Sequence, residues 1–126
     1  RWSSLSAASS PTWSDAIRAE LDSVDAIFNA NMIHISPWAV AEGLFTGAGD
    51  LLGSGGLLFL YGPFKVGGEH TSPSNASFNE SLRERDPLWG VRDLERVDEI
   101  AAAAGLLRIE SNELPANNKL LVFRRG

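Results

Sequence analysis

The sequence predicts an α/β fold with a mostly parallel sheet and an antiparallel C-terminal strand. Two short apolar runs, residues 24–30 and 57–61, flank one helical pattern, which is the order of a β-α-β unit with parallel strands. Only residues 115–118 separate the last two strand patterns, and so short a connection requires an antiparallel pair. We therefore expect residues 12–126 to form a single α/β domain, preceded by a loop or disordered tail at residues 1–11.

The composition limits the classes of function that fit. The 126 residues are 44% hydrophobic and 21% charged, which is ordinary for a globular protein. The net charge is −5 and the basic residues are scattered, which argues against a nucleic-acid-binding surface. The absence of cysteine excludes disulfides and thiolate metal sites. No apolar run reaches the roughly 20 residues that span a bilayer, and no signal peptide is visible. We expect a cytoplasmic protein and leave the nucleus open.

The N-terminal region is rich in serine and alanine and begins at Arg1 rather than at a methionine, so we expect either a piece of a longer protein or a chain whose start was replaced. A short helix is predicted after the tail, because Thr12 is a favourable N-cap. One face of this helix would collect the apolar side chains Trp13, Ile17 and Leu21.

The first strand, residues 24–30, is almost wholly apolar, as in a parallel strand that is covered on both faces. It leads into residues 31–38, NMIHISPW, which we call the octet. Ser36 is a favourable N-cap and Pro37 fits the first helical position, which predicts a helix over residues 37–52. Its apolar stripe should be buried and consists of Val40, Leu44, Phe45, Ala48, Leu51 and Leu52.

Two flexible segments join the following elements. The glycine-rich residues 53–56 follow a helix and precede a strand, the reverse of the order in a phosphate-binding loop, so we predict a helix C-cap and a turn. Residues 66–75 are polar and follow the second strand, a position that is typical of substrate lids.

Helices and strands alternate in the C-terminal half. Ser77 and Glu80 have capping-box spacing and predict a helix at residues 76–85. A second helix is predicted at residues 92–104, with Gly105 after its C-terminus. The final strands are predicted at residues 106–114 and 119–124.

Several ordered motifs are together similar to one known family. They are NMIHISPW at 31–38, EGLF at 42–45, YGPF at 61–64, HTSPSN at 70–75, WGVRD at 89–93 and PANN at 115–118. Over about residues 25–125 the chain resembles the methyltransferase-like 26 family. This is a domain-of-unknown-function family with a class I S-adenosylmethionine (SAM) methyltransferase fold. The resemblance implies a partial Rossmann-like sheet, in which this chain supplies the equivalents of strands 4, 5, 7 and 6.

The resemblance also implies SAM as the cofactor and a methyl acceptor that it does not identify. The first half of the family carries a glycine-rich SAM-binding loop and an acidic residue that would hold the ribose. No segment of this chain matches either one. We therefore expect the C-terminal, substrate-side part of a SAM-dependent methyltransferase.

In this fold the exit of strand 4, here the octet, lies against the methionine end of SAM. The resemblance implies that Asn31, Met32 and Ile35 bind the cofactor and that His34 is catalytic. An imidazole with an ordinary pKa near 6.5 suits a general base, although methyl transfer often needs only proximity and alignment. The alternative is a polar turn, in which Asn31 and His34 bind backbone groups.

Aromatic side chains near the octet have two interpretations. Trp38 either stacks on a ligand ring or holds the helix against the sheet. Tyr61 and Phe64, at the exit of the second strand, either form a wall for the substrate or pack in the core.

His70, Ser72 and Asn75 are predicted to contact the substrate, with a solvated loop as the alternative. The two histidines are far apart and have no spaced carboxylate partners, so no metal site is predicted.

Four further residues have interpretations that the sequence leaves open. Arg92 would pair with a carboxylate of a ligand or of the protein, and Asp93 would cap the last helix. Asn117 and Asn118 are interpreted as turn formers.

Two functions compete. The first is a SAM-dependent methyltransferase with an unknown small-molecule acceptor. The second is a non-catalytic methyltransferase-like scaffold that serves as a protein-interaction module. Its motivation is the strand at residues 24–30, which would lack a neighbour on one side. An unpaired apolar edge favours a homodimer or another partner there.

Overall fold

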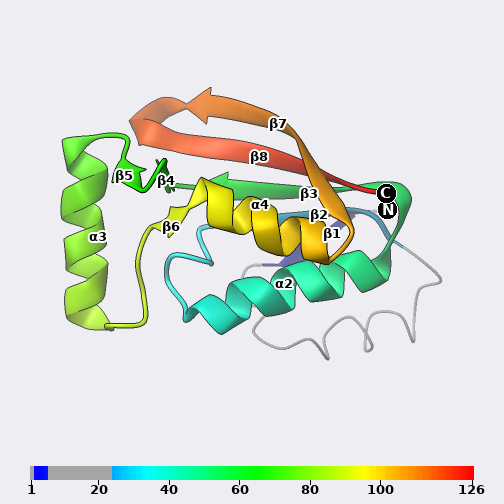
Figure 1. The fold of residues 1–126 in the computed structure, drawn as a ribbon, viewed down its shortest axis with the longest axis horizontal. Coiled ribbons are helices and arrows are strands. Elements are labelled where there is room, and N and C mark those ends of the chain that lie inside the picture. The colour runs from blue at the N-terminus through cyan, green and yellow to red at the C-terminus, as the bar shows by residue number, and fades with distance from the viewer. Residues whose placement is uncertain (1, 6–23) are drawn as a thin grey trace.

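The computed structural model describes residues 2–5 and 24–126 (Figure 1). Its elements in chain order are β1 (Trp2–Leu5), β2 (Val24–Ala30), α2 (Trp38–Leu51), β3 (Leu52–Gly62), β4 (Phe64–Val66), β5 (Glu69–His70), α3 (Pro73–Arg85), β6 (Arg92–Asp93), α4 (Leu94–Ala103), β7 (Leu106–Leu114), the 3-10 turn η1 (Pro115–Asn117) and β8 (Asn118–Arg125).

A five-stranded mixed sheet has the order β1-β2-β3-β8-β7, and a small sheet has the order β5-β4-β6. Strands β1, β2 and β3 are parallel, whereas β8 is antiparallel to both β3 and β7. This confirms the predicted α/β class and the predicted order of the last four main strands. The predicted strands at 24–30 and 106–114 are confirmed, and the final strand is slightly longer than predicted.

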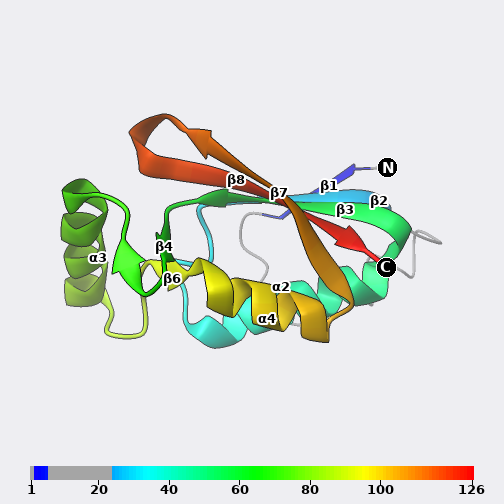
Figure 2. The ribbon, with the colours of Figure 1, turned by 45° about the horizontal axis from the view of Figure 1, so that its top comes forward.

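Helices α2 and α4 cover one face of the main sheet (Figures 1 and 2). Between them and the sheet lies the core, where Phe45 of α2 meets Phe123 of β8 edge to face at 5.2 Å between ring centroids. Phe28 of β2 and Phe59 of β3 are half-buried. The cover of both faces that we expected for β2 stays a prediction. Helix α3 stands apart, at the end of the molecule where β3 terminates (Figure 1).

The described N-terminal residues differ from the prediction. Residues 2–5 form strand β1 rather than a loop, because they pair in parallel with β2, from Trp2 opposite Ala26 to Leu5 opposite Asn29. The expected unpaired edge of β2 is therefore wrong, since β2 has β1 on one side and β3 on the other. The predicted helix beginning at Thr12 lies outside the described residues.

Local hydrogen bonds shift the start of α2. Its N-cap is Pro37 instead of Ser36, because the Ser36 hydroxyl donates to the Met32 carbonyl at 2.8 Å and does not cap the helix.

Hydrogen bonding and strand pairing also move the starts of the other helices. Helix α3 begins before the predicted capping box, because the Ser72 Oγ accepts the Asn75 backbone N–H at 3.1 Å. Helix α4 begins at Leu94, because Arg92 and Asp93 pair with β4 as strand β6.

The two segments predicted as flexible are both structured. Residues 53–56 bulge from the start of β3, since Val24 lies opposite Leu52 whereas Ala26 lies opposite Leu57. The predicted lid at residues 66–75 is instead a β4–β5 hairpin followed by the first turn of α3. Its turn uses two glycines with positive φ, Gly67 at 62° and Gly68 at 80°.

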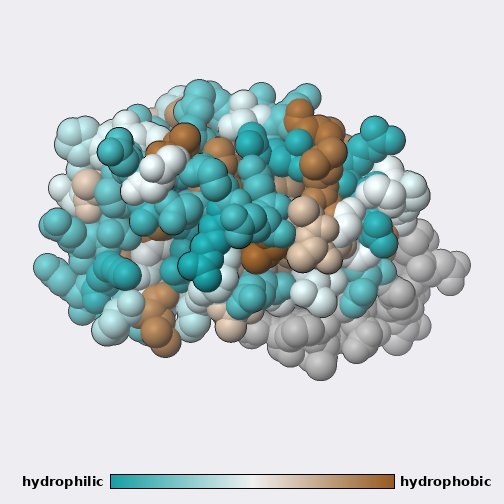
Figure 3. Space-filling view, in the orientation of Figure 1, coloured by the Kyte–Doolittle hydropathy of each residue, from teal (hydrophilic) through white to brown (hydrophobic). Residues whose placement is uncertain are grey.

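The face shown in Figure 3 is mostly polar, with an apolar patch over β7. On that strand Leu107 is 70% exposed and Ile109 48%. No helix of the described chain is long and apolar enough to cross a membrane. The cellular compartment stays a prediction.

Candidate functional site

The octet forms a tight polar turn at the carboxyl end of β2. Asn31 has a φ of 52°, a left-handed conformation that asparagine tolerates better than most residues. Its backbone N–H donates to the Tyr61 carbonyl at 3.0 Å, which joins the turn to the end of β3. The Met32 carbonyl accepts both the Ile35 N–H at 3.0 Å and the Ser36 hydroxyl at 2.8 Å. The turn is thus closed by its own hydrogen bonds.

Arg92 fixes the octet from a distant part of the chain. Its Nε donates to the Ile33 carbonyl at 3.2 Å, and one terminal nitrogen donates to the carbonyls of Ser36 and Leu88, each at 2.7 Å. Among the described residues Arg92 therefore pairs with backbone carbonyls rather than with a protein carboxylate, and a carboxylate of a ligand stays a prediction. Beside these bonds, the Gly90 N–H donates to the His34 carbonyl at 3.0 Å.

A cavity of about 360 Å³, which we call the histidine pocket, opens between the octet, α3 and the β7–β8 connection. Because it lies at the carboxyl ends of the adjacent parallel strands β2 and β3, it occupies the edge where open α/β sheets bind ligands. It is lined by Asn31, His34, Pro63, Ser74, Asn75, Phe78, Ala116 and Asn118.

His34 is only 2% exposed, and burial together with the nearby charge of Arg92 lowers its pKa to about 4. The Phe78 ring meets the imidazole edge to face at 5.7 Å. A Cβ at Gly62 would lie 3.4 Å from the imidazole, so Gly62 lies directly beside the ring. At neutral pH the imidazole is uncharged and offers one hydrogen-bond donor and one acceptor. It is a weaker base than the ordinary pKa led us to expect.

Asn75 is 5% exposed and lines the same pocket. Its side-chain amide nitrogen donates to Thr71 Oγ1 at 3.1 Å and to the Asn117 carbonyl at 3.2 Å. These bonds fix the start of α3 to the β7–β8 connection. Asn118, on the opposite wall, donates to the Tyr61 hydroxyl at 3.1 Å.

Several predicted residues lie outside the pocket lining. Phe64 is buried in the core, as the packing alternative had it, and Met32 is buried with its sulfur 3.4 Å from the Asn29 amide nitrogen. Ser72 caps α3, and Ile35 is 39% exposed. His70 is half-buried in β5. Cofactor and substrate contacts of these residues stay predictions.

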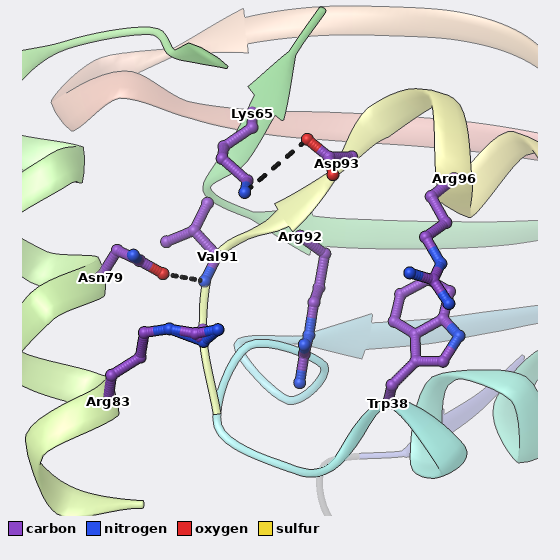
Figure 4. Close-up of a pocket in the computed structure, with 9 residues that line it drawn as sticks. Trp38, Lys65, Asn79, Arg83, Val91, Arg92, Asp93 and Arg96 are labelled. Atoms are coloured by element: carbon purple, nitrogen blue, oxygen red, sulfur yellow. Dashed lines mark hydrogen bonds and ion pairs between the residues drawn. The ribbon is translucent and has the colours of Figure 1, made fainter. Parts of the chain in front are cut away.

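Trp38 belongs to a second cavity, which Figure 4 shows with its neighbours. The guanidinium carbon of Arg96 lies 4.8 Å from the centroid of the indole ring, and that of Arg92 lies 5.6 Å from it. Asp93 occupies the N-cap position of α4, but its side chain makes no capping hydrogen bond and lies 3.8 Å from Lys65 Nζ. Trp38 therefore lines a different cavity from His34 and Asn75.

The histidine pocket contains residues that the sequence interpretation missed, above all Phe78 and Asn118. The PANN motif could have indicated Asn118 as a pocket residue, because it is one of the motifs shared with the resembled family. Ala116 and Asn117 have positive φ, at 65° and 58°, so the turn-forming interpretation of Asn117 agrees with the structure, whereas Asn118 begins β8 and faces the cavity.

The described residues do not form a complete SAM cradle. The histidine pocket is lined by amide, imidazole, hydroxyl and apolar groups, and no carboxylate lines it to bind ribose hydroxyls. Within the described ranges, no cluster of three His, Cys, Asp or Glu side chains is placed to hold a metal ion. The arrangement suits an uncharged polar ligand that exchanges hydrogen bonds with His34 and the three asparagines of the lining.

Comparison with known proteins agrees with this fold. A family model described as "Protein of unknown function (DUF938)" matches residues 5–125. An O-methyltransferase family 2 protein from Planctomyces limnophilus in complex with apigenin is 20% identical, with a TM-score of 0.73, over 82% of this chain and 31% of that one. Human N-acetylserotonin methyltransferase in complex with SAM is 14% identical, with a TM-score of 0.70, over 84% and 30%.

An O-methyltransferase family protein from Burkholderia thailandensis is 16% identical, with a TM-score of 0.70, over 82% of this chain and 31% of that one. The chain thus spans about a third of the length of these structures. At such identities the likeness shows the fold, which is a partial Rossmann-like fold of SAM-dependent methyltransferases.

Proposed function

Because the chain belongs to the DUF938 family of proteins of unknown function, we propose that it is the substrate-side part of a SAM-dependent methyltransferase whose acceptor enters the histidine pocket. Within that family we place it in the methyltransferase-like 26 group, on the basis of the octet and the HTSPSN and PANN motifs. The cytoplasm is the compartment we propose for it.

The observation that carries this proposal is the position of the histidine pocket. It lies at the carboxyl ends of β2 and β3, in a sheet whose strand order matches the second half of the class I methyltransferase fold. Two motifs that are distant in sequence, the octet and PANN, meet there with the first turn of α3. A purely structural turn would not require such a convergence of polar side chains on a cavity.

The described residues would bind and orient the acceptor. The neutral imidazole of His34 would accept a hydrogen bond from a hydroxyl or amine of the methyl acceptor and so orient that group. The side chains of Asn75 and Asn118 would hold the remainder of the molecule by hydrogen bonds. Alignment of this kind is a large part of what a methyl transfer needs from a protein.

Calorimetric titration of SAM and S-adenosylhomocysteine into this chain, and into a version extended at the N-terminus, tests the proposal. We expect saturable heat from the extended version and none from this chain. An absence of heat in the extended version would contradict a SAM-dependent enzyme.

The acceptor pocket is tested separately, by release of labelled product from methyl-labelled SAM with candidate phenols, alcohols and amines. His34→Gln and Asn118→Ala should reduce turnover of any accepted substrate. Glu84→Gln, an exposed change on the far part of α3, is the control and should leave turnover intact.

The alternative function, a non-catalytic scaffold, was based on an expected unpaired edge of the strand at residues 24–30. Strand β2 is paired on both edges, so no unpaired apolar edge remains at residues 24–30. Association into a homodimer stays a prediction that the described residues do not test.

A further inference from the structure

The second cavity, which we call the arginine pocket, concentrates positive charge in an acidic protein. It encloses about 290 Å³. Its cationic side chains come from four separate elements: Lys65 from β4, Arg83 from α3, Arg92 from β6 and Arg96 from α4 (Figure 4). These are four of the chain's eleven lysines and arginines, although the net charge of the whole chain is −5. Because the four side chains come from separate elements, the cluster is not simply the basic face of one helix.

Few protein groups neutralise this charge. Asp93 is the one carboxylate among the lining residues, and its oxygen lies 3.8 Å from Lys65 Nζ. Neither Arg83 nor Arg96 has a carboxylate partner in the part of the chain that the structure describes. The pocket therefore keeps an excess of positive charge at neutral pH.

Two of the four cations, Arg92 and Arg96, are held in place. Arg92 cannot swing away, because its guanidinium already donates to three backbone carbonyls. The indole of Trp38 contacts the guanidinium groups of both Arg92 and Arg96, a cation–π arrangement that positions them side by side. Burial lowers the pKa of Arg92, and the like charges of Arg83 and Arg96 lower it further. A bound anion would relieve this repulsion.

The shape of the pocket also depends on a glycine. A Cβ at Gly90 would lie 2.9 Å from Asn79 Oδ1 and 3.9 Å from a terminal nitrogen of Arg83. That Asn79 oxygen accepts the Val91 N–H at 2.9 Å, so the wall beside Arg83 is fixed. The absent side chain of Gly90 leaves room in front of the guanidinium group.

We propose that the arginine pocket binds the phosphate group of a small phosphorylated molecule. Several guanidinium groups around one small cavity match a tetrahedral dianion, which accepts hydrogen bonds from several directions, better than a single planar carboxylate. The volume, about 290 Å³, is at the lower end of the range for small-molecule sites and therefore fits a small ligand. The proposal stands apart from methyl transfer, because the two pockets share no lining residue.

Isothermal titration of the full chain at low ionic strength tests the site with inorganic phosphate, glycerol 3-phosphate, glycerol and succinate. Saturable binding of either phosphate probe, with none of glycerol, is the expected result. Tighter binding of glycerol 3-phosphate would identify an ester as the ligand, and equal binding would identify free phosphate. Preference for succinate, or no binding of either phosphate at millimolar concentration, would overturn the proposal.

Variants locate the binding. The double variant Arg83→Ala with Arg96→Ala should weaken phosphate binding by about tenfold or more. Arg85→Ala, an exposed arginine on the same helix as Arg83, is the matched control and should change the affinity by less than about twofold. Equal losses in the control and the double variant would mean nonspecific charge attraction and would overturn the site.

Gly90→Ala gives a second test that leaves the charge unchanged. Its added methyl group would occupy the space beside Asn79 and Arg83, so phosphate binding should weaken. Circular dichroism and the thermal midpoint in phosphate-free buffer establish that each variant is folded. Unchanged affinity in both folded variants contradicts the proposal.

Discussion

His34 is the residue whose environment departs most from its ordinary chemistry. Its imidazole lies on the wall of a cavity that is open to ligands, yet burial and Arg92 hold its pKa near 4. The octet can therefore be both a polar turn and a binding site, since the turn uses backbone groups and the His34 side chain remains directed at the cavity. The two interpretations that the sequence left open do not exclude each other.

The buried imidazole should make stability depend on pH. An unfolded chain has an ordinary histidine pKa near 6.5, whereas the folded pKa is about 4. Between these values the unfolded state binds a proton that the folded state does not, so stability is complete above pH 6.5 and falls as the pH drops toward 4. The loss reaches about 3 kcal/mol over the window. Urea unfolding at pH 7.5 and 4.5 measures it.

Carboxylates also titrate between pH 4 and pH 6.5, so the contribution of His34 to the pH dependence of stability must be isolated with a variant. His34→Gln should lack this part of the pH dependence, and the difference between wild type and variant isolates it. His70→Gln, outside the histidine pocket, is the control for removal of an imidazole. Equal pH dependence in wild type and His34→Gln would show that His34 is not held neutral.

At the scale of elements, the two helices of the layer touch where α2 carries a glycine. A Cβ at Gly49 would overlap the carbonyl oxygen of Ala104, directly after α4. The glycine that weakens the isolated helix is thus required for close packing. Gly49→Ala should gain roughly 1 kcal/mol in helix propensity and lose more through the clash, for a net destabilisation of about 1 to 3 kcal/mol.

Chemical denaturation of Gly49→Ala measures this net loss, and Gly53→Ala, in strand β3, is the control for a methyl group added where space is available. A Cβ at Gly53 would meet nothing within 4 Å, so that variant should unfold at nearly the wild-type denaturant concentration. If Gly49→Ala were as stable as the wild type, the helices would have to separate without cost, contrary to the tight contact.

The connection between β6 and the octet depends on one guanidinium group. Arg92→Lys keeps the charge but cannot reach three carbonyls at once, so the carbonyls of Ile33, Ser36 and Leu88 lose donors. We expect a loss of about 2 to 4 kcal/mol in unfolding free energy. Arg85→Lys on the exposed surface should cost less than about 0.5 kcal/mol. Amide spectra of the octet should broaden in the first variant and not in the second.

Elements that are identified by their own composition and their flanking residues were predictable from the sequence. The strand at 24–30 and the strand at 106–114 agree with the structure residue for residue, because their composition and their flanking turn residues identify them without distant contacts. The helix starts were less predictable. Ser36 has two possible partners within one turn, and its bond to Met32 rather than to the helix is decided by the shape of the octet.

The grouping of site residues needed the three-dimensional arrangement. Asn31, His34 and Asn75 were predicted as site residues and do share a cavity. Trp38 was predicted with them, but the orientation of α2 turns its ring toward Arg92 and Arg96 instead. No spacing rule connects a tryptophan with two arginines so far along the chain.

At the scale of the whole molecule, stability should be uneven. Helix α3 stands at one end and buries only Asn75 and Leu82, whereas β3 and β8 pair along the centre of the main sheet (Figure 1). Amide hydrogen exchange should therefore be faster in α3 than in β3, β8 and α4, which buries Leu94, Val97 and Ala101.

Binding of a phosphate ester should change the exchange rate of α3. The reason is that Arg83 of α3 lines the arginine pocket together with residues of β6 and α4. A ligand that binds only the folded arrangement lowers the population of states in which α3 has separated. Exchange in α3 should slow on addition of glycerol 3-phosphate, while exchange in β7, which lines no part of that pocket, should stay the same. Protection of α3 as strong as that of β3 without any anion would contradict the uneven stability.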